Sequence, residues 1–218
     1  MYKYLFSIFL FTPLIGLCDS IGIGGKPDNH APIGVMGEHN HKKGALMFSY
    51  RYMRMEMENL QDAGHDISRT DTVSSSGSYK FMNAPIKMHS NMHMFGSMYG
   101  ISNKLTGMIM VPFLNKKMQI RRRAGDMQRF TVSSRGFGDL KLIGLYSLKE
   151  NQYSKWLLNF GVSIPTGETN VKDVMVMMNN SHSHSTLGYN MQLGSGTYDP
   201  IIKLNYSRQW DNFSLGWQ

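Results

Sequence analysis

Histidine and methionine cluster in an early polar stretch, residues 30–44, which reads HAPIGVMGEHNHKKG. His39 and His41 flank a single residue, and His30 and Met36 are near enough along the chain to reach the same ion. Imidazole and thioether ligands together favour copper over zinc, whose structural sites are built from Cys and His. The stretch therefore predicts a copper-binding segment. The alternative is a polar loop or plug whose histidines are simply solvated.

A second cluster lies near the end of the chain, where residues 174–185 read VMVMMNNSHSHS. His182 and His184 alternate with serine and follow Met175, Met177 and Met178. This pattern predicts a second candidate site for the same soft metal. The alternative is an irregular connection without a ligand.

A third group alternates along one predicted strand. Met88, Met92 and Met94 fall on one face, and His89 and His93 fall on the other. Because opposite faces of a strand cannot share one ion, only one of these rows lines an interior, and we favour the histidine face. The candidate metal ligands are thus His30, Met36, His39, His41, His89, His93, His182 and His184. The alternative for the methionines, which number 19, is a role as flexible apolar filler.

In the segments that would position these residues, apolar and polar residues alternate with a period of two, which predicts β-strands. Residues 86–114 form a predicted hairpin around the turn Ser102-Asn103-Lys104. In residues 45–58, large apolar side chains face one way and Ser49 and Arg51 face the other. Strands with one apolar and one mixed face predict an all-β fold, an antiparallel transmembrane up-and-down β-barrel.

The polar stretches 59–79, 115–131 and 170–193 are predicted to be irregular connections between strands. We count about seven strands, whereas bacterial barrels close with an even number. The strand that begins at Phe213 stops at Gln218 in mid-pattern. We therefore expect an incomplete barrel whose C-terminal strands are missing.

The N-terminal residues 1–20 are typical of a cleaved secretory signal, with Lys3 ahead of an apolar run. Residues 21–44 form a polar segment that contains histidine and methionine, and residues 45–218 form the predicted partial barrel. Cys18 is the single cysteine, so no disulfide can form within the chain. Export and a barrel together predict a location in the bacterial outer membrane.

The formal net charge of +8 is spread along the chain, apart from the cluster Arg121-Arg122-Arg123. Neither a recognition helix nor a stacking motif accompanies this charge, so we expect no nucleic-acid partner. The arginine cluster is read as a solvated loop, with contact to lipid phosphate or an acidic interior wall as the alternative. The sequence has no nucleophile elbow, phosphate loop or HExxH helix, so we do not expect an enzyme.

Several motifs in order carry a resemblance to a known family. HAPIGVMGEHNHKKG is followed by SYRYMRM, MYGISNKLTGMIMVPF, GFGD, IPTG and GSGTYDP. From about His30 onward the chain resembles the outer-membrane transporter family named after the MetA pathway of phenol degradation. The resemblance implies an outer-membrane β-barrel and transport, often of hydrophobic compounds. It implies no catalytic residues.

The leading functional expectation is an outer-membrane transporter or channel for small solutes, including hydrophobic compounds. Its expected partners are outer-membrane lipid and the solute. One alternative is a copper-binding or copper-handling outer-membrane protein that uses the His and Met clusters, with copper as its metal. Another alternative is a soluble periplasmic β-sandwich that binds a ligand.

Overall fold

The structure of the chain is a computed structural model that describes residues 37–73, 79, 81–122, 129–151, 153–176, 181–210 and 214–218. The predicted signal peptide lies outside the described residues, as do His30 and Met36. The described residues are nearly all antiparallel β-structure, in a strongly curled, open sheet that forms an incomplete β-barrel. The all-β, antiparallel barrel fold expected from the sequence is therefore confirmed.

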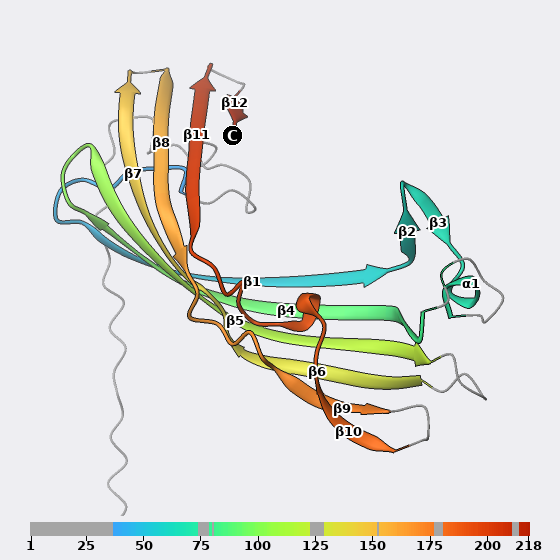
Figure 1. The fold of residues 1–218 in the computed structure, drawn as a ribbon. Helices are drawn as coiled ribbons and strands as arrows, with labels where there is room; N and C mark the ends of the chain where they lie inside the picture. The colour runs from blue at the N-terminus through green and yellow to red at the C-terminus, as the bar shows by residue number, and fades with distance from the viewer. Residues whose placement is uncertain are drawn as a thin grey trace, which may run out of the picture.

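An eight-stranded sheet carries the fold, in the order β1-β4-β5-β7-β8-β11-β12, with β6 paired to β5 as well (Figure 1). Its strands are β1 (Leu46–Glu58), β4 (Asn83–Gly100), β5 (Leu105–Arg122), β6 (Arg129–Phe137), β7 (Leu140–Glu150), β8 (Ser154–Ile164), β11 (Asp199–Gln209) and β12 (Ser214–Trp217). Two small hairpins lie outside it, β2 (Leu60–Asp62) with β3 (His65–Ile67), and β9 (Lys172–Val176) with β10 (His182–Thr186). Strands β1 and β12 form the two edges of the sheet.

The stretches predicted to be irregular connections contain regular structure, so that prediction was wrong. Strand β5 continues to Arg122 and β6 begins at Arg129, while 59–79 contains β2, β3 and helix α1 (Arg69–Val73). The stretch 170–193 contains β9, β10 and the 3-10 helix η3 (Tyr189–Met191). Along β5 the apolar alternation ends beyond Phe113 because the outward side chains Asn115, Lys117 and Gln119 are polar. Backbone pairing continues, since the hydrogen bonds of a sheet do not require apolar side chains.

Strands β6 and β7 are two parts of one long strand that runs beside β5. Phe113 pairs with Phe137 and Met110 pairs with Lys141, so one extra residue lies on the β6–β7 side. This bulge falls at Gly138 and Asp139, and bulges bend the strand that contains them. Beyond it, β7, β8 and β11 turn steeply away from the plane of β1, β4 and β5 (Figure 1).

Two apolar clusters fill the concave side of the sheet. One comprises Met94, Met98, Met108, Met110, Ile143, Leu145 and Leu157 on β4, β5, β7 and β8. The other lies at the far ends of β4, β5 and β6, where Leu187 and Met191 cover the strands. There the Lys116 amine donates to the carbonyl oxygens of Asn190 and Gln192 at 3.1 and 2.6 Å, which ties η3 to β5. No helix within the described ranges is both long and apolar enough to cross a membrane.

Candidate functional site

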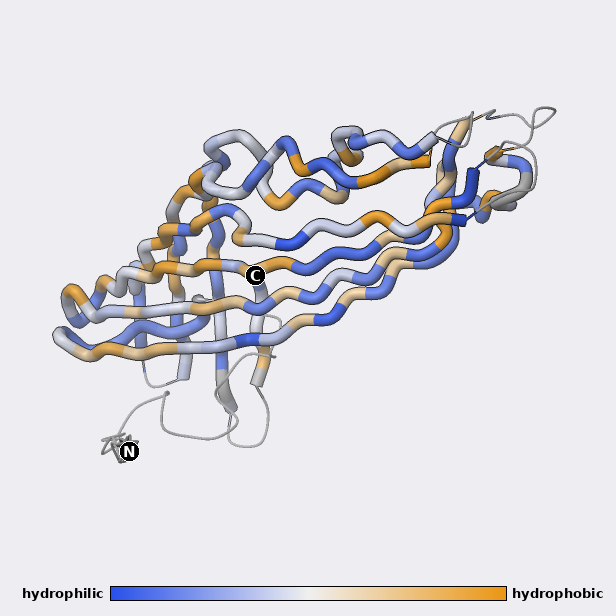
Figure 2. The backbone as a smooth tube through the Cα atoms, turned by 90° about the horizontal axis from the view of Figure 1, so that it is seen from below, coloured by the Kyte–Doolittle hydropathy of each residue, from blue (hydrophilic) through white to orange (hydrophobic). Residues whose placement is uncertain are grey.

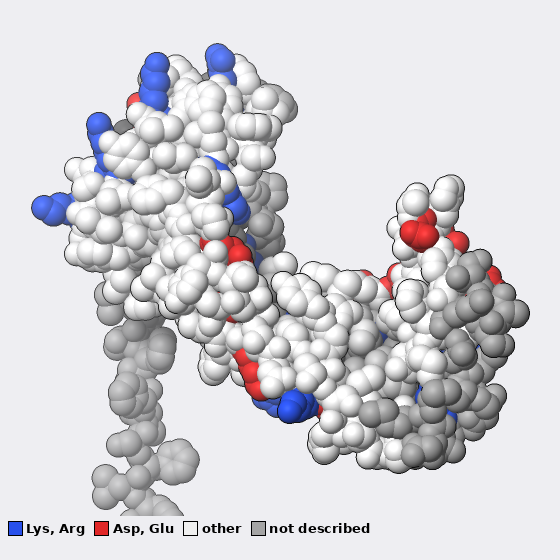
Figure 3. All heavy atoms as spheres, viewed as in Figure 1, with Lys and Arg blue, Asp and Glu red and all other residues white. Residues whose placement is uncertain are grey.

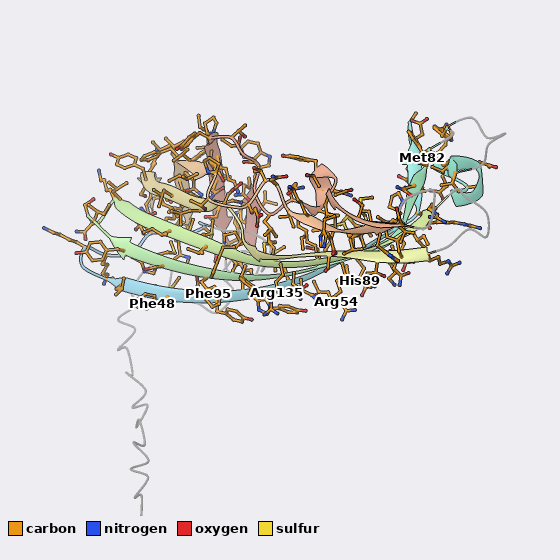
Figure 4. All side chains as sticks on the ribbon, turned by 60° about the horizontal axis from the view of Figure 1, so that its bottom comes forward. Phe48, Arg54, Met82, His89, Phe95 and Arg135 are labelled. Atoms are coloured by element: carbon orange, nitrogen blue, oxygen red, sulfur yellow. The ribbon has the colours of Figure 1, made fainter. Side chains whose placement is uncertain are left out.

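Side chains alternate between two faces of the sheet, which we call the outward (convex) face and the interior (concave) face. Figure 4 shows Phe48, Phe95, Arg54, His89 and Arg135 projecting from the outward face. Their neighbours in sequence point into the curl, where the buried clusters lie. The apolar face predicted for residues 45–58 is outward, since Phe48 is 75% exposed.

The outward face carries a continuous apolar belt. The belt comprises the outward positions of 46–52 on β1, 93–99 on β4, 105–113 on β5, 140–148 on β7, 156–164 on β8 and 200–206 on β11. None of these positions holds Asp, Glu, Lys or Arg. Figure 2 shows how hydrophobic residues concentrate toward one half of the long strands. At about 3.4 Å per residue, 105–113 covers about 27 Å of strand.

One rim of the belt is a row of aromatic rings across four strands. Tyr52, His93, Phe113 and Phe137 oppose one another in register. Successive ring centroids lie 5.1, 6.4 and 5.2 Å apart. The next row outward is polar and consists of Arg54, Asn91, Asn115 and Arg135. The outward face therefore changes from aromatic to polar between two successive rows of side chains, which are two residues apart along each strand.

The opposite rim of the belt also carries aromatic side chains. The rings of Trp156 and Tyr206 lie 4.5 Å apart, and Trp217 pairs with Tyr206 across β12. Figure 3 shows Lys and Arg at the tips of β7, β8 and β11, with a largely uncharged surface below them. Both ends of the belt thus combine aromatic rings with polar or charged neighbours.

The interior face of β1, β4 and β5 is a methionine wall. Every methionine on these strands points inward, and none lies on the outward face. They oppose one another in register, as Met98 does with Met47 on β1 and with Met108 on β5. The set comprises Met47, Met53, Met55, Met57, Met88, Met92, Met94, Met98, Met108, Met110 and Met118.

The interior face of β7, β8 and β11 has different chemistry. It carries Lys141, Lys155 and Lys203 together with the amides of Asn159 and Asn205. This face, which we call the cationic wall, adjoins the methionine wall where β5 pairs with β7. The cationic wall also carries Ile143, Leu145 and Leu157, which pack against methionines of β4 and β5. The interior of the open barrel therefore combines a thioether side with a side that mixes apolar, cationic and amide groups.

Residues 37–44 cross the interior as a strap before β1 begins. The carbonyl oxygen of Gly37 accepts hydrogen bonds from the side-chain amides of Asn159 and Asn205, each at 2.9 Å. Further along, the backbone amide of His41 donates to Thr106 Oγ1 at 2.8 Å. Gly37 has a φ of +70°, and a Cβ there would lie 2.8 Å from the Asn159 amide nitrogen. The strap thus requires glycine at this position.

The strap brings the predicted ligands His39 and His41 together, with ring centroids 4.9 Å apart. His39 Nδ1 lies 3.7 Å from the Glu38 carboxylate. Partial burial and, to a lesser extent, the charge of Lys155 hold the pKa of His41 below its ordinary value. The same charge disfavours a metal cation beside this ring.

His89 and His93 lie on the outward face, so our preference for a histidine-lined interior was wrong. His89 Nδ1 lies 3.4 Å from the Glu56 carboxylate, and His93 Nδ1 lies 2.7 Å from the Tyr50 hydroxyl oxygen. The methionine row takes the interior because flexible apolar side chains fill a concave face better than polar rings do. Nothing in the alternation itself distinguishes inside from outside when both faces carry apolar residues.

His182 and His184 lie on β10, in the hairpin beyond the belt, and both side chains are exposed. They share no strand pairing with β4, which carries His89 and His93. Within the described ranges, no group of three or more His, Cys, Asp or Glu side chains could hold a metal ion. Copper binding stays a prediction, supported in this part of the chain by one pair of rings.

Sequence reasoning missed the contacts that hold the interior together. Asn159 and Asn205 read as ordinary polar positions, although both face inward and grip Gly37. Nothing in the sequence around Gly37 predicts a hydrogen bond to Asn159, which lies 122 residues later in the chain. The only hint was an asparagine within the apolar run 156–164.

Comparison with known proteins identifies no family for this chain. No family model matches it, and no curated protein matches it. Its resemblance to the transporter family of phenol degradation therefore stays a prediction, and its function is argued from the described side chains.

Proposed function

We propose that the chain is an outer-membrane β-barrel channel for small solutes. The observation that supports this most strongly is the charge-free apolar belt on six strands of one curled sheet. Its span of nine residues on β5 fits the roughly nine to eleven residues with which a tilted strand crosses a bilayer. Aromatic rows at both rims match the girdles that flank the apolar band of such barrels.

The lengths of the connections support one orientation. Short turns separate the strands at 101–104 and 151–153 at one rim, whereas 59–82 and 165–198 separate strands at the other rim by much longer stretches. Bacterial barrels have short periplasmic turns and longer extracellular loops. The strap and the His39–His41 pair would then lie at the periplasmic rim, and the charged ends of β4, β5 and β6 would extend outside the cell.

The β-sandwich alternative has no support in the fold. A sandwich buries its inner faces between two stacked sheets. The strands described here form one curled sheet and two small hairpins, so the interior faces other parts of the same sheet, the strap and the segment that contains Leu187 and Met191. Copper handling lacks a ligand set of sufficient size among the described His, Cys, Asp and Glu residues.

Reconstitution of the full chain tests the proposal. The chain is folded into lipid vesicles, and folding is monitored by a heat-modifiable gel shift and β-type circular dichroism. Vesicle swelling in a small sugar such as arabinose then reports passage of solute. We expect a heat-modifiable band and swelling faster than in protein-free vesicles. A protein that stays soluble without detergent, or folded vesicles without flux of any solute, would overturn it.

A further inference from the structure

We propose that the interior selects amphipathic organic anions, meaning a small apolar body that carries one carboxylate or sulfonate. This inference rests on the proposed channel function and names its class of substrate. It follows from the two unlike walls that meet at the β5–β7 pairing. An apolar body would contact the thioethers, and the anionic head would contact Lys141 and Lys203 on the cationic wall and Arg51 on β1.

Methionine occurs on the interior face of β1, β4 and β5 but not on their outward belt. If methionine were a general substitute for other apolar residues here, it would also appear on the outward belt of β1, β4 and β5. That belt contains Leu, Phe, Tyr, Ile and Val but no methionine. Thioethers are flexible and polarizable, make favourable contacts with aromatic rings, and are over-used at promiscuous binding surfaces. Six of these methionines are buried in the two apolar clusters, whereas Met53, Met55 and Met57 on β1 are exposed. Strand β1 therefore offers the thioether surface that an apolar body can reach.

Three interior cations have no acidic partner among the described residues, whereas Lys155 pairs with Glu150. Arg51, Lys141 and Lys203 make no ion pair within the described residues, and the Arg51 Nη1 atom is buried without a hydrogen-bond partner there. Glu150 lies 3.5 Å from Lys155. Asp199 accepts a hydrogen bond of 2.8 Å from the neutral Thr197 and lies in the register row of Lys141, with Ser163 between them. Glu38 lies beside His39. Basic side chains on the interior outnumber these acids, since Lys116 also faces inward, and the excess positive charge favours an anion.

These cations lie at successive depths. Lys203 is in the register row of Asn159 and Leu145, and Lys141 is in the row of Ser163, two rows further from the short turns. Arg51 follows one row later, opposite Met94. In these two rows, Met110 is the cross-strand neighbour of Lys141, and Met94 is the cross-strand neighbour of Arg51. Several weak sites in series allow a solute both to enter and to leave.

Three probe ions whose charge does not change with pH separate the effect of the charge from the effect of the apolar body. Vesicles that contain the full chain are tested with benzenesulfonate, methanesulfonate and benzyltrimethylammonium, with protein-free vesicles as the blank. We expect benzenesulfonate to enter fastest, ahead of methanesulfonate, with benzyltrimethylammonium at least about tenfold slower. Equal rates, or a preference for the cation, would overturn the inference while leaving the channel intact. Absence of flux for all probes and for arabinose would instead overturn the channel.

Substitutions assign the selectivity to the cationic positions. The triple variant Arg51→Gln, Lys141→Gln, Lys203→Gln should slow benzenesulfonate by about tenfold and leave arabinose swelling unchanged. Lys117→Gln on the outward face of β5 is the matched control and should change neither rate. If the triple variant folds, passes arabinose and retains its benzenesulfonate preference, the assignment is wrong.

Discussion

The Asp139 carboxylate accepts a hydrogen bond of 2.7 Å from the backbone amide of Ser195, 56 residues later in the chain. Its second oxygen accepts one of 3.0 Å from the amide of Gly167. Beside it, Thr166 Oγ1 accepts from the Leu140 amide and donates to the Gly138 carbonyl oxygen. The motifs GFGD, IPTG and GSGTYDP thus meet at the bend where β7, β8 and β11 leave the plane of the sheet.

Replacement of Asp139 by Ala should destabilise this bend. Two backbone amides would lose a charged acceptor in a partly buried place, at a cost of about 2–3 kcal/mol in free energy of unfolding. Urea unfolding of the reconstituted protein measures the change. Asp173→Ala is the control, because Asp173 accepts from the Ser133 amide at an exposed position and should cost less. Equal losses for the two variants would contradict the role given to Asp139.

An arginine placed in the belt should block insertion into a membrane. Ile109 and Gln119 both face outward on β5, but only Ile109 lies in the belt. A cationic side chain on the lipid face costs about 2–4 kcal/mol at mid-depth and little beyond the interface. Ile109→Arg should therefore lose most of its heat-modifiable band in vesicles, whereas Gln119→Arg should keep it. Similar folded yields for the two variants would count against the membrane belt.

Acidification should loosen the strap. The pKa of His41 is below its ordinary value of 6.5 in the folded protein, chiefly through burial and secondarily through Lys155. Below pH 6.5 the unfolded strap therefore binds a proton that the folded strap resists, and stability falls as pH drops toward the folded pKa. Limited proteolysis within residues 37–44 at pH 7.5 and 5.5 measures this. The effect should disappear in His41→Gln; its persistence there would exclude His41 as the cause.

The copper prediction has its own test. We expect His39→Gln combined with His41→Gln to leave Cu(I) uptake by the folded protein unchanged, since two rings beside Lys155 hold a cation poorly. Isothermal titration of Cu(I) in detergent measures uptake, with His182→Gln as the control. Binding that is tight in the parent protein and lost in the paired variant would restore the copper site at the strap.

Sequence reasoning placed the strands and their faces because alternation records burial one residue at a time. The outward run Trp156, Leu158, Phe160, Val162 and Ile164 was visible as one apolar face, and the structure puts it on the belt. Strand ends at 115–131 were not visible, because outside the belt both faces tolerate polar residues. The alternation of apolar and polar residues then no longer marks the strand, although strand β5 continues to Arg122.

The sequence by itself determined the all-β class, the period-two faces and the positions of the main turns, since each depends on neighbours along the chain. Only the tertiary structure decided which face is interior, because that depends on the direction in which the sheet curls. The hydrogen bonds of Asp139 and of the Gly37 carbonyl oxygen join the bend and the strap to partners more than 50 residues away along the chain. Contacts at such separation leave no periodic trace in the sequence, so the methionine wall could be recognised only once the sheet was bent.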